Sequence, residues 1–152
     1  MGARWHDAMR RAIDVARAAQ AHGDVPIGSV VLGPAGDVVS VGGNERELLG
    51  DPTAHAEIVA IRRAAQRLGE WRLTGCSIVV TLEPCTMCAG AIVAARLEHL
   101  VFGAFDDKAG AVASLFDVVR DPRLNHAVRV TSGVLRDDCA QLLADFFQER
   151  RA

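Results

Sequence analysis

Hydrophobic and polar positions in the first third of the chain predict one helix followed by a β-hairpin. Within residues 6 to 21, apolar side chains such as Met9 and Ile13 recur at helical spacing, with Arg and Asp between them. Two short runs rich in β-branched residues, 26 to 33 and 38 to 43, are separated by a turn that contains Gly and Pro. We therefore expect an amphipathic helix and then two antiparallel strands.

The next predicted element is a helix that starts near Asp51 and Pro52 and stops at Gly69. Asp is a common N-cap, and Pro is favoured in the first turn. After a loop, this helix would carry His55 and Glu57 close to its N-terminus. Its apolar residues fall on one face: Ile58, Ile61, Ala65 and Leu68.

Strands and helices alternate in the middle of the chain. We expect a strand over residues 76 to 82, a helix over 85 to 96 and another strand over 97 to 103. This alternation implies right-handed crossovers and a largely parallel sheet in that part of the fold. A less regular segment follows, with one short helix over 112 to 119 and an edge strand over 127 to 131.

The end of the chain, from Leu135 onward, predicts a final amphipathic helix. Its apolar stripe consists of Cys139, Leu142, Leu143 and Phe146. Together the patterns indicate an α/β fold with a mixed five-stranded sheet and about five helices. Because no linker or internal repeat interrupts them, we expect a single domain over residues 1–152.

Composition and charge narrow the class of protein. Half of the 152 residues are hydrophobic and 24% are charged, which is typical of a soluble globular protein. No apolar run is long enough to cross a bilayer, so no membrane partner is expected. Four cysteines without an export signal favour a reducing, cytoplasmic location. The net charge of −2 argues against nonspecific nucleic-acid binding, so a nucleic acid would have to meet a local patch.

Three residues form a candidate zinc site. Cys85 and Cys88 are three positions apart at a helix start, so both sulfurs lie on one helix face, and His55 supplies a third ligand. Structural zinc is normally closed by four protein ligands, whereas catalytic zinc keeps a position for water. Cys76 and Cys139 are poor fourth ligands because each is better placed in the core. The ligand count therefore favours catalysis over structural zinc.

Glu57 is the candidate general acid and base. Residues two apart diverge on a helix flank, so Glu57 and His55 can converge only if the metal lies over the helix end. Two thiolates cancel the charge of Zn²⁺, and two helix N-termini would partly restore its power to acidify water. Glu57 beside that water can take its proton and return it to a departing amine. This chemistry is hydrolytic deamination.

Three segments resemble one family. They are the stretches 51 to 57, around His55, 81 to 91, around Cys85, and 145 to 151, at the end of the last helix. Together they resemble the bacterial tRNA-specific adenosine deaminases, within the zinc deaminase superfamily. The resemblance implies a three-layer α/β/α cytidine-deaminase-like fold and one Zn²⁺ per subunit. It also implies a homodimer that converts adenosine to inosine at the wobble position of a tRNA anticodon, with no DNA as natural substrate.

The resemblance also implies substrate contacts. Asn44 matches a base-contacting asparagine, although an Asn after a strand is also typical of a turn. Asp106 and Lys108 match a segment that contacts the nucleotides beside the target. Asp106 there could accept a hydrogen bond from a ribose 2′-hydroxyl, which would help to separate RNA from DNA.

The last helix offers further candidates. Phe146 lies on the apolar stripe and is expected in the core, whereas Phe147 is offset from it and is available to stack on a base. Arg150 and Arg151 either form a solvated helix end or bind phosphates.

Two rival functions remain. A deaminase of the same fold can act on a free base or nucleotide, such as guanine, cytidine or deoxycytidylate, and the zinc motif alone does not separate it from a tRNA enzyme. A noncatalytic zinc-binding domain would leave Glu57 without a role.

Overall fold

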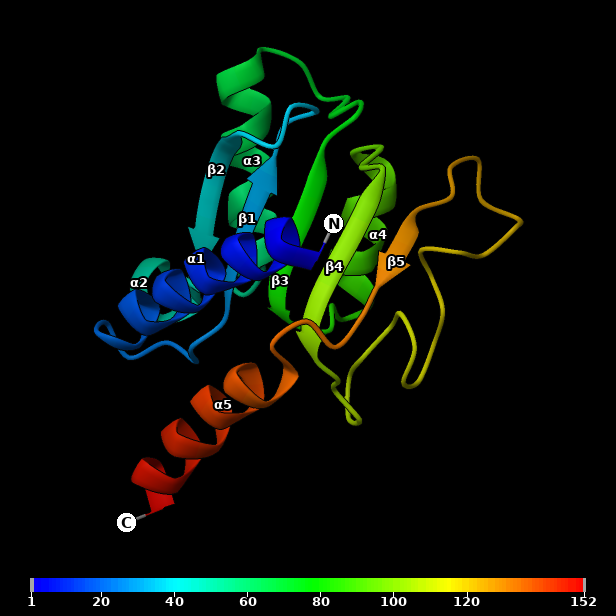
Figure 1. The fold of residues 1–152 in the computed structure, drawn as a ribbon. Helices are drawn as coiled ribbons and strands as arrows, with labels where there is room; N and C mark the ends of the chain where they lie inside the picture. Colours follow the sequence, from blue (N-terminus) through cyan, green and yellow to red (C-terminus); the bar gives the residue numbers. More distant parts are fainter. Residues whose placement is uncertain (1, 152) are drawn as a thin grey trace.

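The computed structural model describes residues 2–151, which form five strands and five helices (Figure 1). Met1 and Ala152, the two ends of the predicted domain, lie outside the described residues. The elements, in chain order, are α1 (Gly2–Gln20), β1 (Gly28–Leu32), β2 (Val38–Gly43), α2 (Arg46–Leu49), α3 (Ala56–Leu68), β3 (Ser77–Leu82), α4 (Thr86–Ala94), β4 (His99–Ala104), β5 (Arg129–Thr131) and α5 (Arg136–Arg151).

The strands form one mixed sheet in the order β2-β1-β3-β4-β5. β1 is antiparallel to both β2 and β3, while β3 with β4 and β4 with β5 are parallel. The predicted hairpin and the predicted parallel half of the sheet are both confirmed. α4 provides the crossover from β3 to β4, as a parallel pair requires.

Helices cover both faces of the sheet (Figure 1). Val30, Val79 and Val101 of the three central strands pack on the side of α1 and α5. Their neighbours Ile78 and Phe102 point the other way, into the larger core beneath α3 and α4. This alternation follows from the two-residue repeat of a strand and confirms the predicted three-layer arrangement. Within residues 2–151, no helix is long and apolar enough to cross a membrane.

α3 packs on the sheet through small residues rather than through its larger apolar stripe. At Gly42 of β2 there is no room for a side chain, because a Cβ there would collide with the backbone of Ala60. Ile58 and Ile61 are only half-buried, and Trp71 nearby is 54% exposed. Together they line an apolar groove between α3 and α4, which we call the α3/α4 groove: Ile58, Ile61, Ala65, Trp71, Ala91 and Ala94.

Three predictions about the helices are wrong. α3 begins at Ala56 and not at Asp51, because the Asp51 carboxylate accepts hydrogen bonds from the N–H and the hydroxyl of Thr53 and so closes a local turn. The segment 112 to 119 contains no helix. The loop expected before α3 instead contains the short helix α2.

Three strands end, and one helix begins, at the same edge of the sheet. β2, β3 and β4 all end there, since Gly43 pairs with Gly28 at the start of β1 and Leu82 pairs with Ala104 (Figure 1). α4 also begins at this edge, directly after β3. We call it the site edge.

Candidate active site and metal centre

Three side chains that can bind a metal meet at the site edge. His55 immediately precedes α3, Cys85 immediately precedes α4, and Cys88 lies in the first turn of α4. His55 Nδ1 is 3.6 Å from Cys85 Sγ and 3.5 Å from Cys88 Sγ, and all three donor atoms lie within 4.8 Å of one another. A single ion with Zn–N and Zn–S bonds of about 2.0 to 2.3 Å can reach donors at such separations.

Both helix starts depart from the usual capping chemistry. His55 and Cys85 occupy N-cap positions, where Ser, Thr, Asp or Asn normally accepts a backbone hydrogen bond. Neither side chain makes such a bond, so both remain available for a metal. The two helix N-termini also bring roughly half a positive charge each to the cluster, which favours thiolate ligands. The two helix ends meet here as the spacing of the motif predicts.

The pKa values of the two thiols at the start of α4 are shifted in opposite directions. A hydrogen bond from Cys88 lowers the pKa of Cys85 to about 3, and His55 contributes in the same direction. The same contact, together with burial, raises the pKa of Cys88. A divalent cation that binds both sulfurs displaces the remaining proton, because thiolate is the metal-binding form. One nitrogen and two sulfurs therefore fit Zn²⁺.

Glu57 lies in the first turn of α3 and is only 4% exposed. Burial raises its pKa to about 7; its own backbone N–H opposes that rise, and negative charge on Cys85 adds to it. Besides that N–H, the Cys88 thiol is its hydrogen-bonding neighbour. This carboxyl group is therefore held next to the ligands with few partners of its own.

Cys76 and Cys139 lie outside the metal-capable group found within residues 2–151. Both are buried, Cys76 among the residues beneath α3 and α4 and Cys139 on the opposite face with α1. Burial raises the pKa of both thiols. As expected from the sequence, they are packing residues and do not complete a four-ligand structural site.

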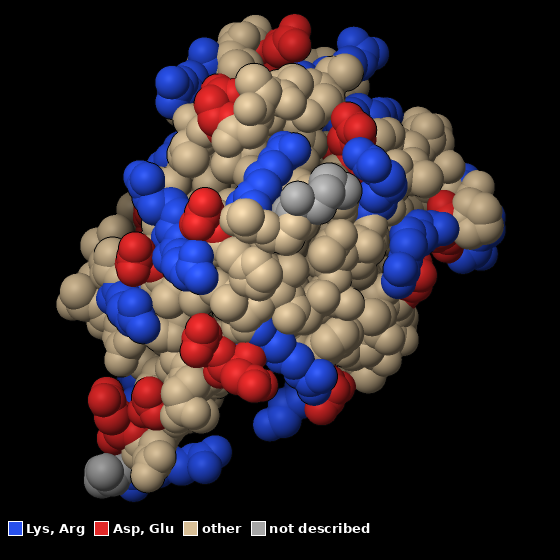
Figure 2. All heavy atoms as spheres, viewed as in Figure 1, with Lys and Arg blue, Asp and Glu red and all other residues tan. Residues whose placement is uncertain are grey.

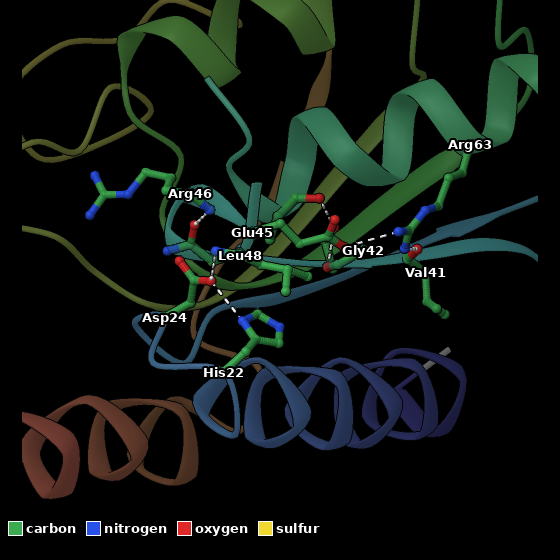
Figure 3. Close-up of polar contacts among 11 residues, drawn as sticks. His22, Asp24, Val41, Gly42, Glu45, Arg46, Leu48 and Arg63 are labelled. Carbon is green, nitrogen blue, oxygen red and sulfur yellow. Dashed lines mark hydrogen bonds and ion pairs between the residues drawn. The ribbon is translucent and has the colours of Figure 1, made fainter. Parts of the chain in front are cut away.

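Asn44 follows β2 at the site edge and is buried. Its side-chain oxygen accepts a hydrogen bond from the N–H of Arg46, at 3.3 Å, so the residue does shape a turn. Two anchors hold the following residues: buried Asp24 accepts the N–H of Glu47 and Leu48, and Arg63 of α3 donates to Glu45. Figure 3 shows Asp24 between His22 and α2, and Arg63 reaching toward Glu45 and Val41. The structure thus holds Asn44 in a rigid loop.

Asp106 and Lys108 follow β4 at the same edge. The Asp106 side chain accepts hydrogen bonds from the N–H of Lys108 and Ala109, at 3.1 and 3.2 Å. One carboxylate oxygen therefore closes a tight turn, and the other is available. Lys108 is exposed.

The candidate residues in the last turns of α5 differ in their exposure and in their contacts. Phe146 is buried as predicted, and Phe147 is 45% exposed with its ring against the edge of Phe146. Arg150 stacks over Phe146, with 4.4 Å from its guanidinium carbon to the ring centroid, and donates to the Gly23 carbonyl. Arg151 is exposed. Arg150 is thus tied to the protein, which leaves Phe147 and Arg151 as the more accessible pair.

Two buried carboxylates near the site have no counterpart among the expected residues. Asp24 anchors α2, and Glu83 lies between β3 and Cys85. The backbone N–H groups that these two carboxylates accept lie more than twenty residues away in the sequence, so local spacing does not reveal the contacts. An acidic residue at the end of an apolar strand, two positions before a metal ligand, was the available signal for Glu83.

Comparison with known proteins shows the family of this chain. A family model described as MafB19-like deaminase matches residues 3–151. The tRNA-specific adenosine deaminase of Haemophilus influenzae is 48% identical over 143 residues, which cover 94% of this chain and 83% of that protein. The chain belongs to the tRNA-specific adenosine deaminase family.

Solved structures agree with membership in this family. A structure from a study of A-to-I editing by tRNA:A34 deaminases at the wobble position of transfer RNA has a TM-score of 0.86 at 44% identity, covering 90% of this chain and 99% of the other. A guanine deaminase from Nitrosomonas europaea has a TM-score of 0.76 at 27% identity, covering 93% and 83%. The same fold therefore also occurs in an enzyme named for a free base, at lower identity.

Proposed function

We propose that residues 2–151 work as one zinc-dependent deaminase domain that converts adenosine to inosine at the wobble position of a tRNA anticodon. The observation that carries this proposal is the three-donor cluster beside the buried Glu57, in a chain 48% identical to a tRNA-specific adenosine deaminase. The tRNA:A34 deaminase structure, matched at a TM-score of 0.86, supports the choice of position in the RNA.

His55, Cys85 and Cys88 would hold one Zn²⁺ per subunit. When bound, zinc with three protein ligands supplies Lewis-acid chemistry that makes water acidic at neutral pH. The N-termini of α3 and α4 favour negative charge at the same place. The protein thus prepares a water nucleophile and excludes bulk solvent around Glu57.

Glu57 is the proton carrier in this mechanism. The adenosine base is flipped into the site, and water attacks C6, the carbon that bears the amine. Glu57 takes a proton from the attacking water and delivers it to the amine nitrogen, which then leaves as ammonia. One carboxylate serves both transfers, because it lies beside the ligands and is shielded from solvent.

Three residues at the site edge would contact the RNA. Asn44 would bind the target base through its side-chain nitrogen, since its oxygen is engaged with Arg46. Asp106 would accept a hydrogen bond from a ribose 2′-hydroxyl, which favours RNA over DNA, and Lys108 would approach a phosphate. Their turn after β4 holds both at the edge where the metal ligands lie.

At the end of α5, exposed Phe147 would stack on a base and Arg151 would approach a phosphate. Arg150 would act indirectly, because it ties α5 to Gly23. On the face that carries α1 and α5, basic and acidic residues are interspersed (Figure 2), and Arg10 and Arg17 pair with Asp7 and Asp14. We therefore place the RNA at the site edge and the end of α5, and not across the rest of this face.

We further propose a homodimer that works in the cytoplasm, where its tRNA substrate is found. The α3/α4 groove supports the dimer, because its apolar residues stay partly exposed to solvent in the structure of residues 2–151. Light scattering should give twice the chain mass of 16.2 kDa, and Ile61→Glu should shift it toward one chain. A monomer at working concentration would refute the dimer.

The rival is a deaminase of free bases or nucleotides, which the likeness to the guanine deaminase favours at lower identity. An anticodon stem-loop with adenosine at the wobble position should be deaminated, with free adenosine, guanine, cytidine and deoxycytidylate as poor substrates. Mass spectrometry detects the exchange of an amine for a carbonyl oxygen. Fast turnover of a free compound with none of the stem-loop would overturn the tRNA assignment.

A further inference from the structure

Glu83 is a buried carboxylate that no step of the proposed reaction uses. It follows the last residue of β3, precedes Cys85 by two positions, and is only 2% exposed. Its backbone N–H donates to the Ala104 carbonyl at the end of β4, at 2.9 Å. Its position therefore joins the strand that leads to the metal ligands with the strand that leads to Asp106 and Lys108.

The Glu83 side chain accepts five hydrogen bonds from one segment, residues 106 to 114. One oxygen, Oε1, accepts the N–H of Asp106, at 3.1 Å, and the hydroxyl of Ser114. The other, Oε2, accepts the N–H groups of Val112, Ala113 and Ser114 at 3.1, 2.8 and 2.9 Å. These donors converge on the carboxylate as they would on a bound anion.

The surrounding backbone closes around this carboxylate. At Gly110 a Cβ would collide with the Glu83 carboxylate, so only glycine leaves the space that it occupies. The N–H of Ala111 donates to the Pro84 carbonyl at 2.8 Å, next to the ligand Cys85. Since residues 106 to 114 contain no helix or strand, these contacts hold the segment in place of a regular hydrogen-bond ladder.

We propose that Glu83 is a positioning residue for the deaminase. It holds the segment 106 to 114 in one place relative to Cys85, so that nucleotides bound by Asp106 and Lys108 bring the target base to the metal. The inference rests on the proposed function and deepens it, because it assigns the alignment of substrate and metal to a residue that contacts neither. Glu83 thus governs how well RNA is bound productively, while the chemical step belongs to Glu57.

Glu83→Gln tests the proposal with little change of shape. The carboxamide nitrogen donates and does not accept, so at least one group of N–H donors loses its acceptor. We expect KM for the anticodon stem-loop to rise at least about tenfold, with kcat at saturating RNA much less affected, because RNA binding must then reorder a segment that has lost hydrogen bonds of that order of free energy. Zinc content should stay at one per subunit.

Hydrogen exchange provides a second readout that does not depend on activity. In Glu83→Gln, the amides of Val112, Ala113 and Ser114 should exchange faster than in the unsubstituted protein, and those of β1 should not change. Asp121→Asn is the matched control, since Asp121 also accepts a backbone N–H, from Arg123, in the same irregular region. This control should alter neither KM nor exchange at residues 112 to 114.

Three results would overturn the proposal: unchanged exchange at residues 112 to 114, faster exchange there with unchanged KM, or a loss of kcat as large as that of Glu57→Ala. If Glu83→Gln does not fold, Ser114→Ala takes its place, with the same direction of change in KM and exchange expected and no change in either overturning the inference. Failure of the unsubstituted protein on the stem-loop would instead refute the proposed function, and the exchange data would still decide whether Glu83 holds the segment.

Discussion

Glu57 and Glu83 are both glutamates, both are almost fully buried, and both lie two residues from a metal ligand, yet their surroundings differ. Burial raises the pKa of Glu57 to about 7, and its hydrogen-bonding neighbours are its own N–H and the Cys88 thiol. Burial also acts to raise the pKa of Glu83, but bonds from the Ser114 hydroxyl and from backbone N–H groups outweigh it and lower that pKa.

The difference separates a reacting group from a positioning group. A buried carboxylate with few partners pays a desolvation cost that only a function at that place explains. A carboxylate that receives several hydrogen bonds is stabilised in its charged form and ties together the groups that donate them. In this chain Glu57 keeps its oxygens available beside the ligands, and Glu83 has its oxygens engaged by the segment 106 to 114.

The largest effect should come from losing the metal. Cys88→Ser, or treatment with a chelator, should abolish deamination of the stem-loop, because Glu57 then has no activated water from which to take a proton. The Glu83 contacts should persist, so the amides of residues 112 to 114 should stay protected from exchange. Metal analysis, the activity assay and exchange on the same samples check this. Loss of protection at residues 112 to 114 together with the loss of activity would show that the two carboxylates are not independent.

Replacing each of the two glutamates by Ala should change the free energy of unfolding by different amounts. Glu83→Ala leaves several buried N–H donors without an acceptor and should lower the free energy of unfolding by about 2 to 4 kcal/mol. Glu57→Ala removes a carboxylate with few partners, so its unfolding free energy should stay within about 1 kcal/mol of the unsubstituted value. Urea unfolding of the zinc-loaded proteins measures both. Similar losses for both would break the comparison.

The sequence predicted the place of Glu57 beside the metal ligands, but it did not predict the role of Glu83. The spacing of His55, Glu57, Cys85 and Cys88 predicts convergence over helix ends, because it is a local pattern that helix geometry constrains. The start of α3 was predicted too early, since Asp51 caps a turn with Thr53 rather than a helix. Local capping preferences do not distinguish these two uses of Asp.

The hydrogen bonds of the Glu83 carboxylate could not be predicted, because the residues that donate them are distant in the sequence. A helix was predicted over residues 112 to 119, but the N–H groups of Leu115 and Phe116 donate to the Gly110 carbonyl and that of Val118 to the Ala111 carbonyl, and not to carbonyls four residues back. Glu83 accepts the N–H groups of Val112, Ala113 and Ser114 in the same segment. Asp24 acts similarly on α2. Such contacts depend on how strands lie side by side, which residue spacing does not encode.

The smallest effect is expected when one of the five hydrogen bonds to the Glu83 side chain is removed. Ser114→Ala removes the hydroxyl that donates to Glu83 and leaves every backbone donor in place. The unfolding free energy should fall by about 1 kcal/mol, which sharpens the comparison by giving the share of a single partner. Thermal or urea unfolding measures it. A loss as large as that of Glu83→Ala would mean that the hydroxyl, and not the backbone donors, carries the contact.

The most direct test is the deamination rate at saturating anticodon stem-loop for Glu57→Gln and Glu83→Gln, each loaded with zinc and measured beside the unsubstituted protein. The rate should fall about 10²- to 10⁴-fold for Glu57→Gln, because the proton carrier is lost. For Glu83→Gln it should stay within about tenfold, since binding rather than chemistry is affected. Near-normal turnover by Glu57→Gln, or equal losses in both variants, would contradict the account.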